Sequence, residues 1–344
     1  MNSLLEKYKL NIECIDSVDW KTEESNGNSI LFYKINPEDP NTIRNFEKRI
    51  KGSKYKYCLV NSTKIKAPNI IPIKNTDWSE LQKQCCDEIY PVNINTKKLI
   101  GITGTNGKTT TTDIIRQILV NEKINVLTVG TLGVWKNEKN ISDFGLTSPS
   151  YIDLRKILFQ NKEIDTIVCE MSSHALDQNR YYKVDLDVAI WTSFSQDHLD
   201  YHKSMEDYFL SKSKIIFKLR DKSNLLVSKL DRDILDRLDC KLENEVENNI
   251  NISNEYFKVP YNLKNLSLAV KAINLLGFSI KTSLETLKPT PGRYNIYNNK
   301  ENGKVIIDFA HTPDAIENIS KQLKETYTDK MLIVVYGCGG DRDK

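Results

Sequence analysis

A glycine-rich stretch followed by lysine and threonine carries the most recognisable chemistry in the sequence. Residues 101–110 read GITGTNGKTT. The common phosphate-binding loop, G-x-x-x-x-G-K-[ST], would require glycine at position 102, where this chain has Ile102. A strand-like run precedes the stretch and a helix-like run follows it. This context favours a nucleotide loop, in which Lys108 would neutralise phosphate oxygens and the Thr109 hydroxyl would bind Mg²⁺. A plain glycine-rich turn is the alternative.

The histidines indicate a site at the same edge of a sheet. The chain has four, His174, His198, His202 and His311, and each closes or directly follows an expected strand. Ligands of open α/β sheets bind beyond the carboxyl ends of the strands. Glu170 and His198 end two such strands and could share a divalent ion with ATP oxygens. A salt bridge or cap for Glu170, and a helix-start hydrogen bond for His198, are equally open readings.

Strands and helices must alternate to position these groups, and from Lys98 onward they do. Apolar runs predict strands at 98–103, 125–131, 166–172, 184–194 and 223–228, and helical periodicity predicts helices at 109–122, 205–219 and 262–277. In the first helix Ile114, Ile115, Ile118 and Leu119 share one face, and Gly277 is a candidate C-cap of the last. Such alternation predicts a parallel sheet covered by helices on both faces.

The two ends of the chain are less regular. Residues 1–93 offer only short strand-like runs at 29–35 and 55–60, and the polar segment after Pro91 predicts a linker. After residue 292 we expect one βαβ unit: a strand at 304–310, a helix at 313–325 and a strand at 331–340. A parallel sheet of two strands is not stable alone, so we expect this C-terminal domain to be incomplete.

Composition excludes several classes of protein. A formal charge of +3 is too small to predict binding to nucleic acid, and no apolar stretch approaches the ~20 residues that span a bilayer. The seven cysteines include no C-x-x-C pair, which argues against a zinc ribbon or a disulfide scaffold. We expect a cytoplasmic monomer that contacts neither membrane nor nucleic acid.

Eight motifs occur in the order seen in the Mur ligases: GITGTNGKTT, LTSPS, EMSSHALDQNR, SFSQDHLDYH, YNLKN, PGRYNIY, DFAHTPD and YGCGGDRDK. From about Lys98 to Lys344 the chain resembles this family, most of all the branch that adds the third amino acid to UDP-N-acetylmuramoyl-L-alanyl-D-glutamate. The resemblance implies a three-domain α/β architecture. Its parts would be a divergent UDP-sugar-binding domain (1–95), a central P-loop parallel-sheet ATPase domain (96–291) and an incomplete Rossmann-like domain that binds the amino acid (292–344).

The resemblance also implies roles for individual residues. Lys108, Glu170, His198 and Lys212 would be catalytic. Thr109, Glu170, His198 and Lys212 would hold Mg²⁺, Lys212 after carbamylation, although by pattern alone it is a surface lysine. ATP would be bound by Gly104, Thr105, Asn106, Gly107, Lys108, Thr109, Thr110, Asn262, Asn265, Arg293, Asp308 and His311. The UDP-muramoyl-dipeptide would be bound by Thr147, Ser148, Ser172, Gln178 and Arg180.

The implied activity is an ATP-dependent ligase of peptidoglycan precursor synthesis. ATP would convert the substrate carboxylate to an acyl phosphate, which the amine attacks, while Lys108 and two Mg²⁺ ions offset charge. We expect diaminopimelate as the amino acid; lysine stays open, because the DNPR-like segment that selects it does not occur in the sequence. The alternatives are a folylpolyglutamate-type ligase, against which SSHALDQNR and DHLDYH argue, and a non-catalytic nucleotide- or UDP-sugar-binding relative. We expect little or no ligase activity from these 344 residues alone.

Overall fold

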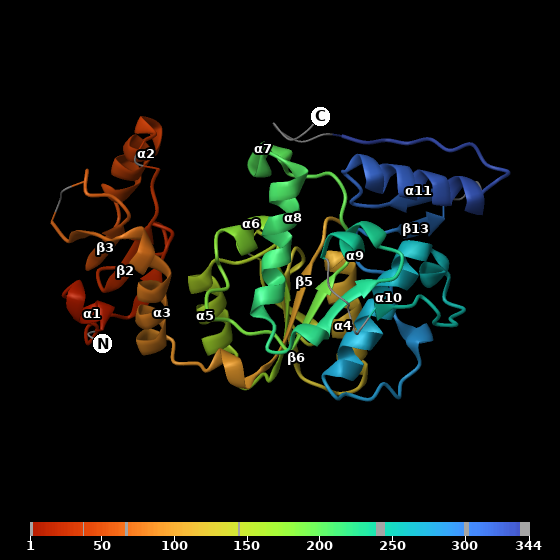
Figure 1. The fold of residues 1–344 in the computed structure, drawn as a ribbon, viewed down its shortest axis with the longest axis horizontal. Coiled ribbons are helices and arrows are strands. Elements are labelled where there is room, and N and C mark those ends of the chain that lie inside the picture. Colours follow the sequence, from red (N-terminus) through yellow and green to blue (C-terminus); the bar gives the residue numbers. More distant parts are fainter. Residues whose placement is uncertain are drawn as a thin grey trace. The chain divides into compact units, whose positions relative to one another are not determined.

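The computed structural model describes residues 3–36, 38–65, 68–143, 145–238, 245–298 and 303–337. The chain divides into two compact units (Figure 1). Unit 1 comprises Met1–Ile94, Pro149–Glu163 and Asn179–Tyr182, and unit 2 comprises Asn95–Ser148, Ile164–Gln178 and Lys183–Lys344. The first passage between the units follows Ile94, within the stretch expected to be a linker. The three domain ranges given above stay a prediction.

Unit 1 is built on a parallel sheet of four strands in the order β1-β2-β3-β4. These strands are β1 (Ser17–Asp19), β2 (Ser29–Tyr33), β3 (Tyr57–Val60) and β4 (Ile70–Pro72). The helices are α1 (Leu4–Lys7), α2 (Pro40–Ile50), α3 (Trp78–Ile89) and α5 (Tyr151–Gln160). Phe46 of α2 packs against Leu31 and Val60 of the sheet. The two expected strand-like runs contain β2 and β3 and are confirmed.

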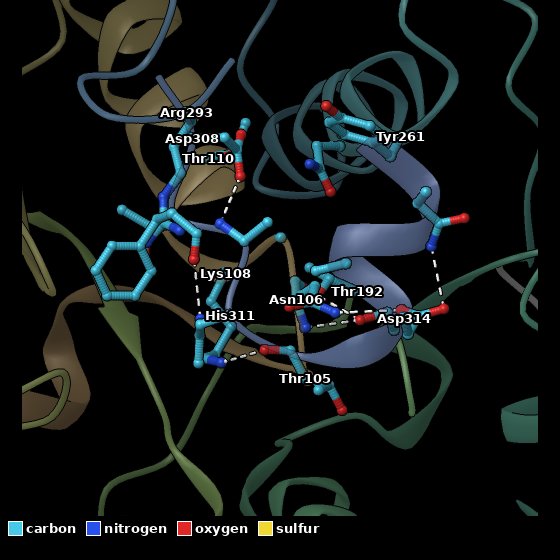
Figure 2. A pocket seen from close by; sticks show the side chains of 18 of the residues that line it. Thr105, Asn106, Lys108, Thr110, Thr192, Tyr261, Arg293, Asp308, His311 and Asp314 are labelled. Carbon is cyan, nitrogen blue, oxygen red and sulfur yellow. Dashed lines mark hydrogen bonds between the residues drawn. The ribbon is translucent and has the colours of Figure 1, made fainter. Parts of the chain in front are cut away.

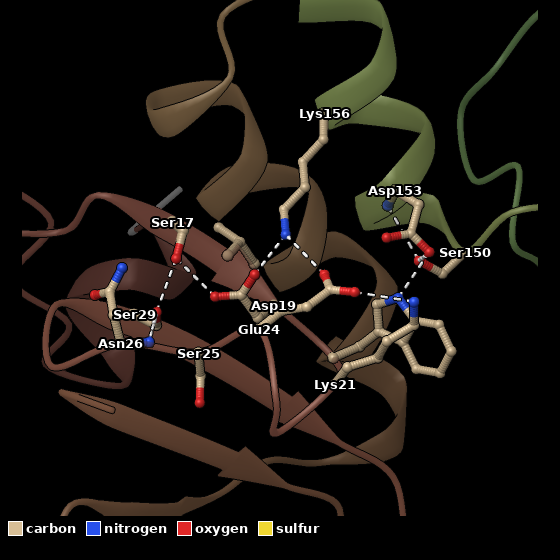
Figure 3. Close-up of polar contacts among 12 residues, drawn as sticks. Ser17, Asp19, Lys21, Glu24, Ser25, Asn26, Ser29, Ser150, Asp153 and Lys156 are labelled. Carbon is tan, nitrogen blue, oxygen red and sulfur yellow. Dashed lines mark hydrogen bonds and ion pairs between the residues drawn. The ribbon is translucent and has the colours of Figure 1, made fainter. Parts of the chain in front are cut away.

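A buried ion pair attaches α5 to this sheet (Figure 3). The Asp19 side chain at the end of β1 is 1% exposed and contacts the ammonium group of Lys156, which also lies 3.7 Å from Glu24 Oε2. Beside it, Trp20 Nε1 donates a hydrogen bond of 2.7 Å to Asp153 Oδ2. A buried carboxylate needs such a partner, because leaving it unpaired would cost several kcal/mol. The helix α5 is therefore part of unit 1, although it is distant from β1 in sequence.

Unit 2 contains a sheet of eight strands in the order β12-β11-β10-β5-β9-β6-β7-β8. The expected strands are confirmed as β5 (Lys98–Thr103), β6 (Val126–Gly130), β9 (Thr166–Glu170), β10 (Val188–Trp191) and β11 (Leu225–Ser228), all parallel. Three strands were not expected: β12 (Glu245–Val246) and the antiparallel strands β7 (Gly133–Lys136) and β8 (Lys139–Ser142).

Helices of unit 2 cover this sheet. They are α4 (Lys108–Asn121), α6 (Ser173–Asp177), α7 (Leu199–His202), α8 (Met205–Ser213), α9 (Arg232–Leu238) and α10 (Pro260–Leu275). Helices α4 and α10 lie side by side and share one apolar cluster with β5 (Figure 1). The predicted apolar face of α4 is confirmed, since Ile114, Ile115, Ile118 and Leu119 are all buried there. Gly277 follows α10 with a φ of +81°, as expected of a C-cap glycine. No helix in the described part of the chain is long and apolar enough to cross a membrane.

The prediction of a parallel βαβ unit at the C-terminal end is wrong. The strand β14 (Lys304–Ile307) and the helix α11 (Pro313–Thr326) form as expected, but β14 pairs antiparallel with β13 (Asn295–Asn298). Residues 331–337 of the expected second strand are in no strand, and 338–340 lie outside the described residues. Apolar composition signals a tendency to be buried but does not supply a partner strand. In the described chain this segment is exposed, with Val335 at 92%.

Candidate functional site

The loop between β5 and α4 bends at two glycines. Gly104 has a φ of +144° and Gly107 a φ of +89°, a region that side chains rarely allow. A Cβ atom on Gly107 would lie 2.7 Å from Asn265 Oδ1, so space as well as conformation requires glycine. Gly101 lies within β5, and Ile102 is a fully buried strand residue. The absence of glycine at position 102 therefore does not distort the loop.

The loop and the start of α4 form a candidate anion-binding site. Gly107 is the N-cap of α4, whose first amide groups have no partner within the helix. Lys108 Nζ donates hydrogen bonds to Gly104 O at 2.7 Å and Thr105 O at 2.9 Å. Burial lowers the pKa of Lys108. A cavity of about 270 Å³ opens in front of Lys108, Thr109 and the loop (Figure 2). A phosphate group would find both backbone donors and a cation here.

Glu170, at the end of β9, lies against the first turn of α4. Thr109 Oγ1 donates to Glu170 Oε2 at 3.1 Å, and Thr131 donates from its N–H to Oε1 at 2.9 Å. Burial raises the pKa of Glu170, so a nearby cation would stabilise the ionised form. A Cβ atom on Gly130 would lie 2.1 Å from Glu170 Oε1, which restricts that position to glycine. A hydroxyl and a carboxylate are thus paired, and both are oxygen ligands that Mg²⁺ accepts.

His198 follows β10 with a left-handed backbone, φ 55° and ψ 31°. Its Nε2 lies 3.3 Å from Asp197 Oδ2, and its ring centroid lies 4.8 Å from that of His174. Burial, opposed by Asp197 and reinforced by His174, lowers the pKa of His198 to about 4. The imidazole is therefore neutral at pH 7, the form in which histidine binds a metal ion.

An NMR titration of His198 will show a midpoint near 4, well below the ordinary 6.5. A depressed pKa means that the folded protein resists the proton that the unfolded chain accepts. This contribution to stability is fully present above pH 6.5 and is lost as the pH falls from there towards 4. The matched variant His198→Asn identifies the resonance and will lose less stability over that interval. A midpoint at or above 6.5 would contradict the burial described here.

Lys212 is not the surface lysine that the helical pattern suggests. In the last turn of α8 its side chain is 1% exposed, and Nζ donates to Gly104 O at 2.9 Å. The ammonium lies 4.3 Å from the centre of the Tyr208 ring. Burial, reinforced by the neighbouring Lys108, holds the pKa of Lys212 well below its ordinary value. Lys108 and Lys212 therefore share one carbonyl oxygen, and the lowered pKa favours the neutral amine of Lys212 more than in an exposed lysine.

Oxygen and nitrogen ligands for a metal ion are present but sparse. Among the described residues, no group of three or more His, Cys, Asp or Glu side chains is arranged to hold a metal ion. The predicted set Thr109, Glu170, His198 and Lys212 lies around one loop, but Lys212 in its amine form is a hydrogen-bond donor. A divalent ion would need further oxygens from a ligand, as expected where Mg²⁺ is bound together with nucleotide phosphates.

Three of the predicted substrate-binding residues lie beside Glu170. Ser148 Oγ donates to Glu170 O at 2.8 Å and accepts from Ser172 N at 2.9 Å. Thr147 Oγ1 accepts a hydrogen bond of 3.2 Å from Thr131 Oγ1. The other two predicted residues are not in this group. Gln178 Nε2 donates to Tyr201 OH of α7 at 3.3 Å, and Arg180 belongs to unit 1.

The predicted nucleotide-binding residues of α10 and of the segment after residue 292 line the same cavity. Asn262 and Asn265 are buried on α10, and Asn262 Nδ2 donates to Tyr256 O at 3.0 Å. Arg293 Nη2 donates to Thr109 Oγ1 at 3.3 Å, and its guanidinium lies 4.3 Å from the Phe309 ring centre. Figure 2 includes Asp308, which accepts from Tyr294 N at 2.8 Å, and His311, whose Nδ1 is 2.9 Å from Phe309 O.

Comparison with known families agrees with this geometry. The pattern of the Mur ligase middle domain matches residues 102–299, which is more than half of the chain. The chain belongs to the Mur ligase family. The pattern of the Mur ligase glutamate ligase domain matches residues 292–344. The family resemblance inferred from the motifs is therefore confirmed.

Several Mur ligases of known name are similar to the chain. A UDP-N-acetylmuramoyl-L-alanyl-D-glutamate–2,6-diaminopimelate ligase of Clostridium botulinum is 37% identical over 280 residues, which cover 72% of this chain and 57% of that protein. Ligase 1 of the same name from Clostridium acetobutylicum is 32% identical over 371 alignment positions, covering 97% of this chain and 75% of that protein. The ligase of Alkaliphilus oremlandii is 32% identical and is covered over 59% of its length. The chain thus spans less than three fifths of two of these three proteins.

Solved structures confirm the α/β fold of the family. A 2,6-diaminopimelate ligase superposes with a TM-score of 0.68 at 20% identity, covering 99% of this chain and 78% of that one. The MurF ligase of Thermotoga maritima in complex with ADP gives a TM-score of 0.58 at 15% identity, with 91% and 75% covered. A folylpolyglutamate synthase/dihydrofolate synthase of Yersinia pestis gives 0.53 at 19% identity, with 72% and 70% covered. Likeness at these identities concerns the fold.

The Mur ligase cavity contains polar residues that sequence reasoning missed. They include Asp197, Tyr261, Lys264 and Asp314. Asp314 Oδ2 accepts a hydrogen bond of 3.3 Å from Asn106 Nδ2 of the loop, and Lys264 Nζ pairs with Asp231 Oδ1 at 2.9 Å. The position of Asp197 beside His198 was a usable signal. Lys264 and Asp314 lie within the motifs YNLKN and DFAHTPD, which were the available signal. Their place beside the loop depends on the fold, since only the folded chain brings α10 and α11 to it.

Proposed function

We propose that the chain acts in an ATP-dependent ligase that adds diaminopimelate to UDP-N-acetylmuramoyl-L-alanyl-D-glutamate. The observation that carries this proposal is the meeting of Lys108, Thr109 and Arg293 at one cavity, with Glu170 accepting a hydrogen bond from Thr109. The name shared by relatives at 32–37% identity supports this substrate and amino acid. We further propose ATP and Mg²⁺ as cofactors, and a cytoplasmic monomer that works in peptidoglycan precursor synthesis.

In this proposal the residues of the loop mainly bind and orient the charged groups of ATP and Mg²⁺. Lys108 exchanges the carbonyl oxygens of Gly104 and Thr105 for phosphate oxygens, while the amides at the start of α4 bind the same anion. Thr109 and Glu170 offer oxygens, and His198 a neutral nitrogen, to Mg²⁺. When bound, that ion offsets the repulsion between a phosphate group and a carboxylate. Arg293 adds a second cation beside Thr109.

Lys212 gains a role through its chemistry with carbon dioxide. Its neutral amine is nucleophilic, because burial and Lys108 disfavour the charged form. A bond from Nζ to the carbon of CO₂, with loss of one proton from Nζ to water, gives a carbamate with one negative charge. The side chain thereby changes from a donor to Gly104 O into an oxygen ligand, and it places a negative charge beside Lys108.

The protein equilibrated with ¹³C-labelled bicarbonate at pH 8 will show a carbamate carbon signal that disappears in Lys212→Met. The reason is that burial lowers the pKa of Lys212 and so favours its reactive neutral amine, whereas ordinary lysines remain protonated at this pH. Lys214→Met, an exposed neighbour that pairs with Asp177, serves as the control and will retain the signal. A wild-type protein without the signal would leave Lys212 as a buried amine and remove it from the metal ligands.

The direct test of the proposed function is a product assay. The protein is incubated with UDP-N-acetylmuramoyl-L-alanyl-D-glutamate, ATP and Mg²⁺, with either meso-diaminopimelate or L-lysine. Mass spectrometry identifies the product, and phosphate release reports turnover. We expect an amide product with diaminopimelate from a full-length version of the protein that includes this chain, and little or none from these 344 residues alone. A product with lysine alone would change the amino acid, glutamylation of a folate would favour the alternative ligase, and ATP binding without any product would favour a non-catalytic relative.

A further inference from the structure

One buried imidazole connects three helices next to the cavity. His202, the last residue of α7, is 4% exposed. Its Nε2 lies 2.8 Å from Ser173 Oγ at the start of α6, and its Nδ1 lies 3.4 Å from Ser211 Oγ in the last turn of α8. Burial is the main cause that lowers the pKa of His202. In a neutral ring one nitrogen donates and the other accepts, and a serine hydroxyl can do either, so both contacts can be satisfied together.

The three connected segments are those that carry the candidate metal ligands. Ser173 comes three residues after Glu170 at the end of β9. Ser211 directly precedes Lys212. The backbone N–H of His202 itself donates to His198 O at 3.0 Å. The side chain of His202 thus contacts the segments that follow Glu170 and precede Lys212, and its backbone N–H contacts His198.

The helix α7 needs such an attachment because its backbone is strained at both ends. It has four residues, and both flanking positions are left-handed without being glycine: His198 with a φ of 55° and Lys203 with a φ of 57°. Such a backbone conformation is unfavourable for a residue other than glycine and persists only where surrounding contacts determine it. The ring of His202 supplies those contacts, packing 5.1 Å from the Tyr208 ring and 5.4 Å from the His174 ring between centroids.

We propose that His202 is a positioning residue: by joining α6, α7 and α8 through Ser173 and Ser211, it holds His198 and Lys212 in register with Glu170 for metal binding. This inference rests on the proposed function only for its consequence in the reaction. Whether His202 holds α6, α7 and α8 together in the metal-free protein can be tested independently of the reaction. Partners that orient metal ligands without touching the ion typically change metal affinity or activity by about 10- to 100-fold when removed.

The first experiment measures amide hydrogen exchange by NMR in the protein without nucleotide or metal. Tyr201 and residue 202 are the probes, because their N–H groups bond to His198 O. His202→Phe keeps an aromatic ring and removes both hydrogen bonds, while Ser173→Ala and Ser211→Ala remove one each. We expect about 10-fold faster exchange at the probes in all three, with amides of β5 unchanged. Ser213→Ala is the matched control, since Ser213 Oγ bonds to Leu210 O of its own helix.

The second experiment measures Mn²⁺ affinity in the presence of a non-hydrolysable ATP analogue, together with kcat and KM for ATP. We expect the Mn²⁺ dissociation constant to rise about 10- to 100-fold in His202→Phe, with a lower kcat and little change in KM for ATP. His202→Gln, whose amide can still reach Ser173, will recover part of the loss. Unchanged exchange in His202→Phe, or the same effect in Ser213→Ala, would overturn the proposal. If wild-type protein forms no product while the exchange results hold, the proposed function fails and the positioning role stands.

Discussion

Replacing Lys108 by methionine will weaken ATP binding by about 10²- to 10³-fold, because losing one partner of a buried charged contact typically costs roughly 2–5 kcal/mol. Lys108 is the loop's own cation and already faces the cavity, hydrogen-bonded to two carbonyl oxygens that a phosphate would replace. Methionine preserves the length of the side chain and removes the charge. Isothermal titration calorimetry with ATP and Mg²⁺ measures the change.

The same substitution will not destabilise the protein without ligand. Burial lowers the pKa of Lys108, which means that the folded chain already disfavours its charged form. A thermal melt without nucleotide will therefore place Lys108→Met at or slightly above the wild type. Lys139→Ala, an exposed lysine in β8, is the control for charge alone and will bind ATP normally. ATP affinity within threefold of the wild type in Lys108→Met would show that the loop does not bind the phosphates.

Replacing Glu170 by glutamine will reduce Mg²⁺-dependent ATP binding by about 100-fold, because a charge contribution of several kcal/mol is largely lost. The amide oxygen can still accept the hydrogen bond from Thr131 N, so the geometry at the end of β9 is retained. Only the negative charge beside Thr109 disappears. Titrating Mg²⁺ at fixed ATP separates this effect from phosphate binding, and Glu138→Gln in the exposed turn after β7 is the matched control.

Without metal, Glu170→Gln will gain stability relative to the wild type as the pH rises. Burial raises the pKa of Glu170 above its ordinary 4.5. A raised pKa contributes stability below 4.5 that is lost as the pH rises through the folded value. Glutamine does not ionise, so the variant does not lose stability in this way as the pH rises. Melting temperatures in EDTA at pH 5 and pH 8 test the sign, and a variant that is relatively weaker at pH 8 would contradict it.

The β5–α4 loop shows what a sequence can predict, because its signals are local. The two glycines, Lys108 and the apolar face of α4 lie within about twenty residues, and the structure confirms their arrangement. The burial of Lys212 could not be predicted, since it depends on a carbonyl 108 positions away in sequence. For the same reason α5 could not be assigned to unit 1, because Lys156 and Asp19 are 137 positions apart. The strand predicted at residues 331–337 was wrong for a different reason. Their composition is typical of a strand, but the described part of the chain offers them no partner strand.

The contact between α5 and β1 has a consequence for the order in which the protein can be completed during synthesis. The chain passes between the two units five times, after residues 94, 148, 163, 178 and 182. Asp19 leaves the ribosome long before Lys156, and β5, α4 and the β7–β8 hairpin are made in between. The carboxylate of Asp19, which is buried in the folded protein, therefore lacks Lys156 as its ion-pair partner until much of unit 2 has been translated. Since domains usually complete folding in order from the N-terminus, this chain departs from the common sequence of events.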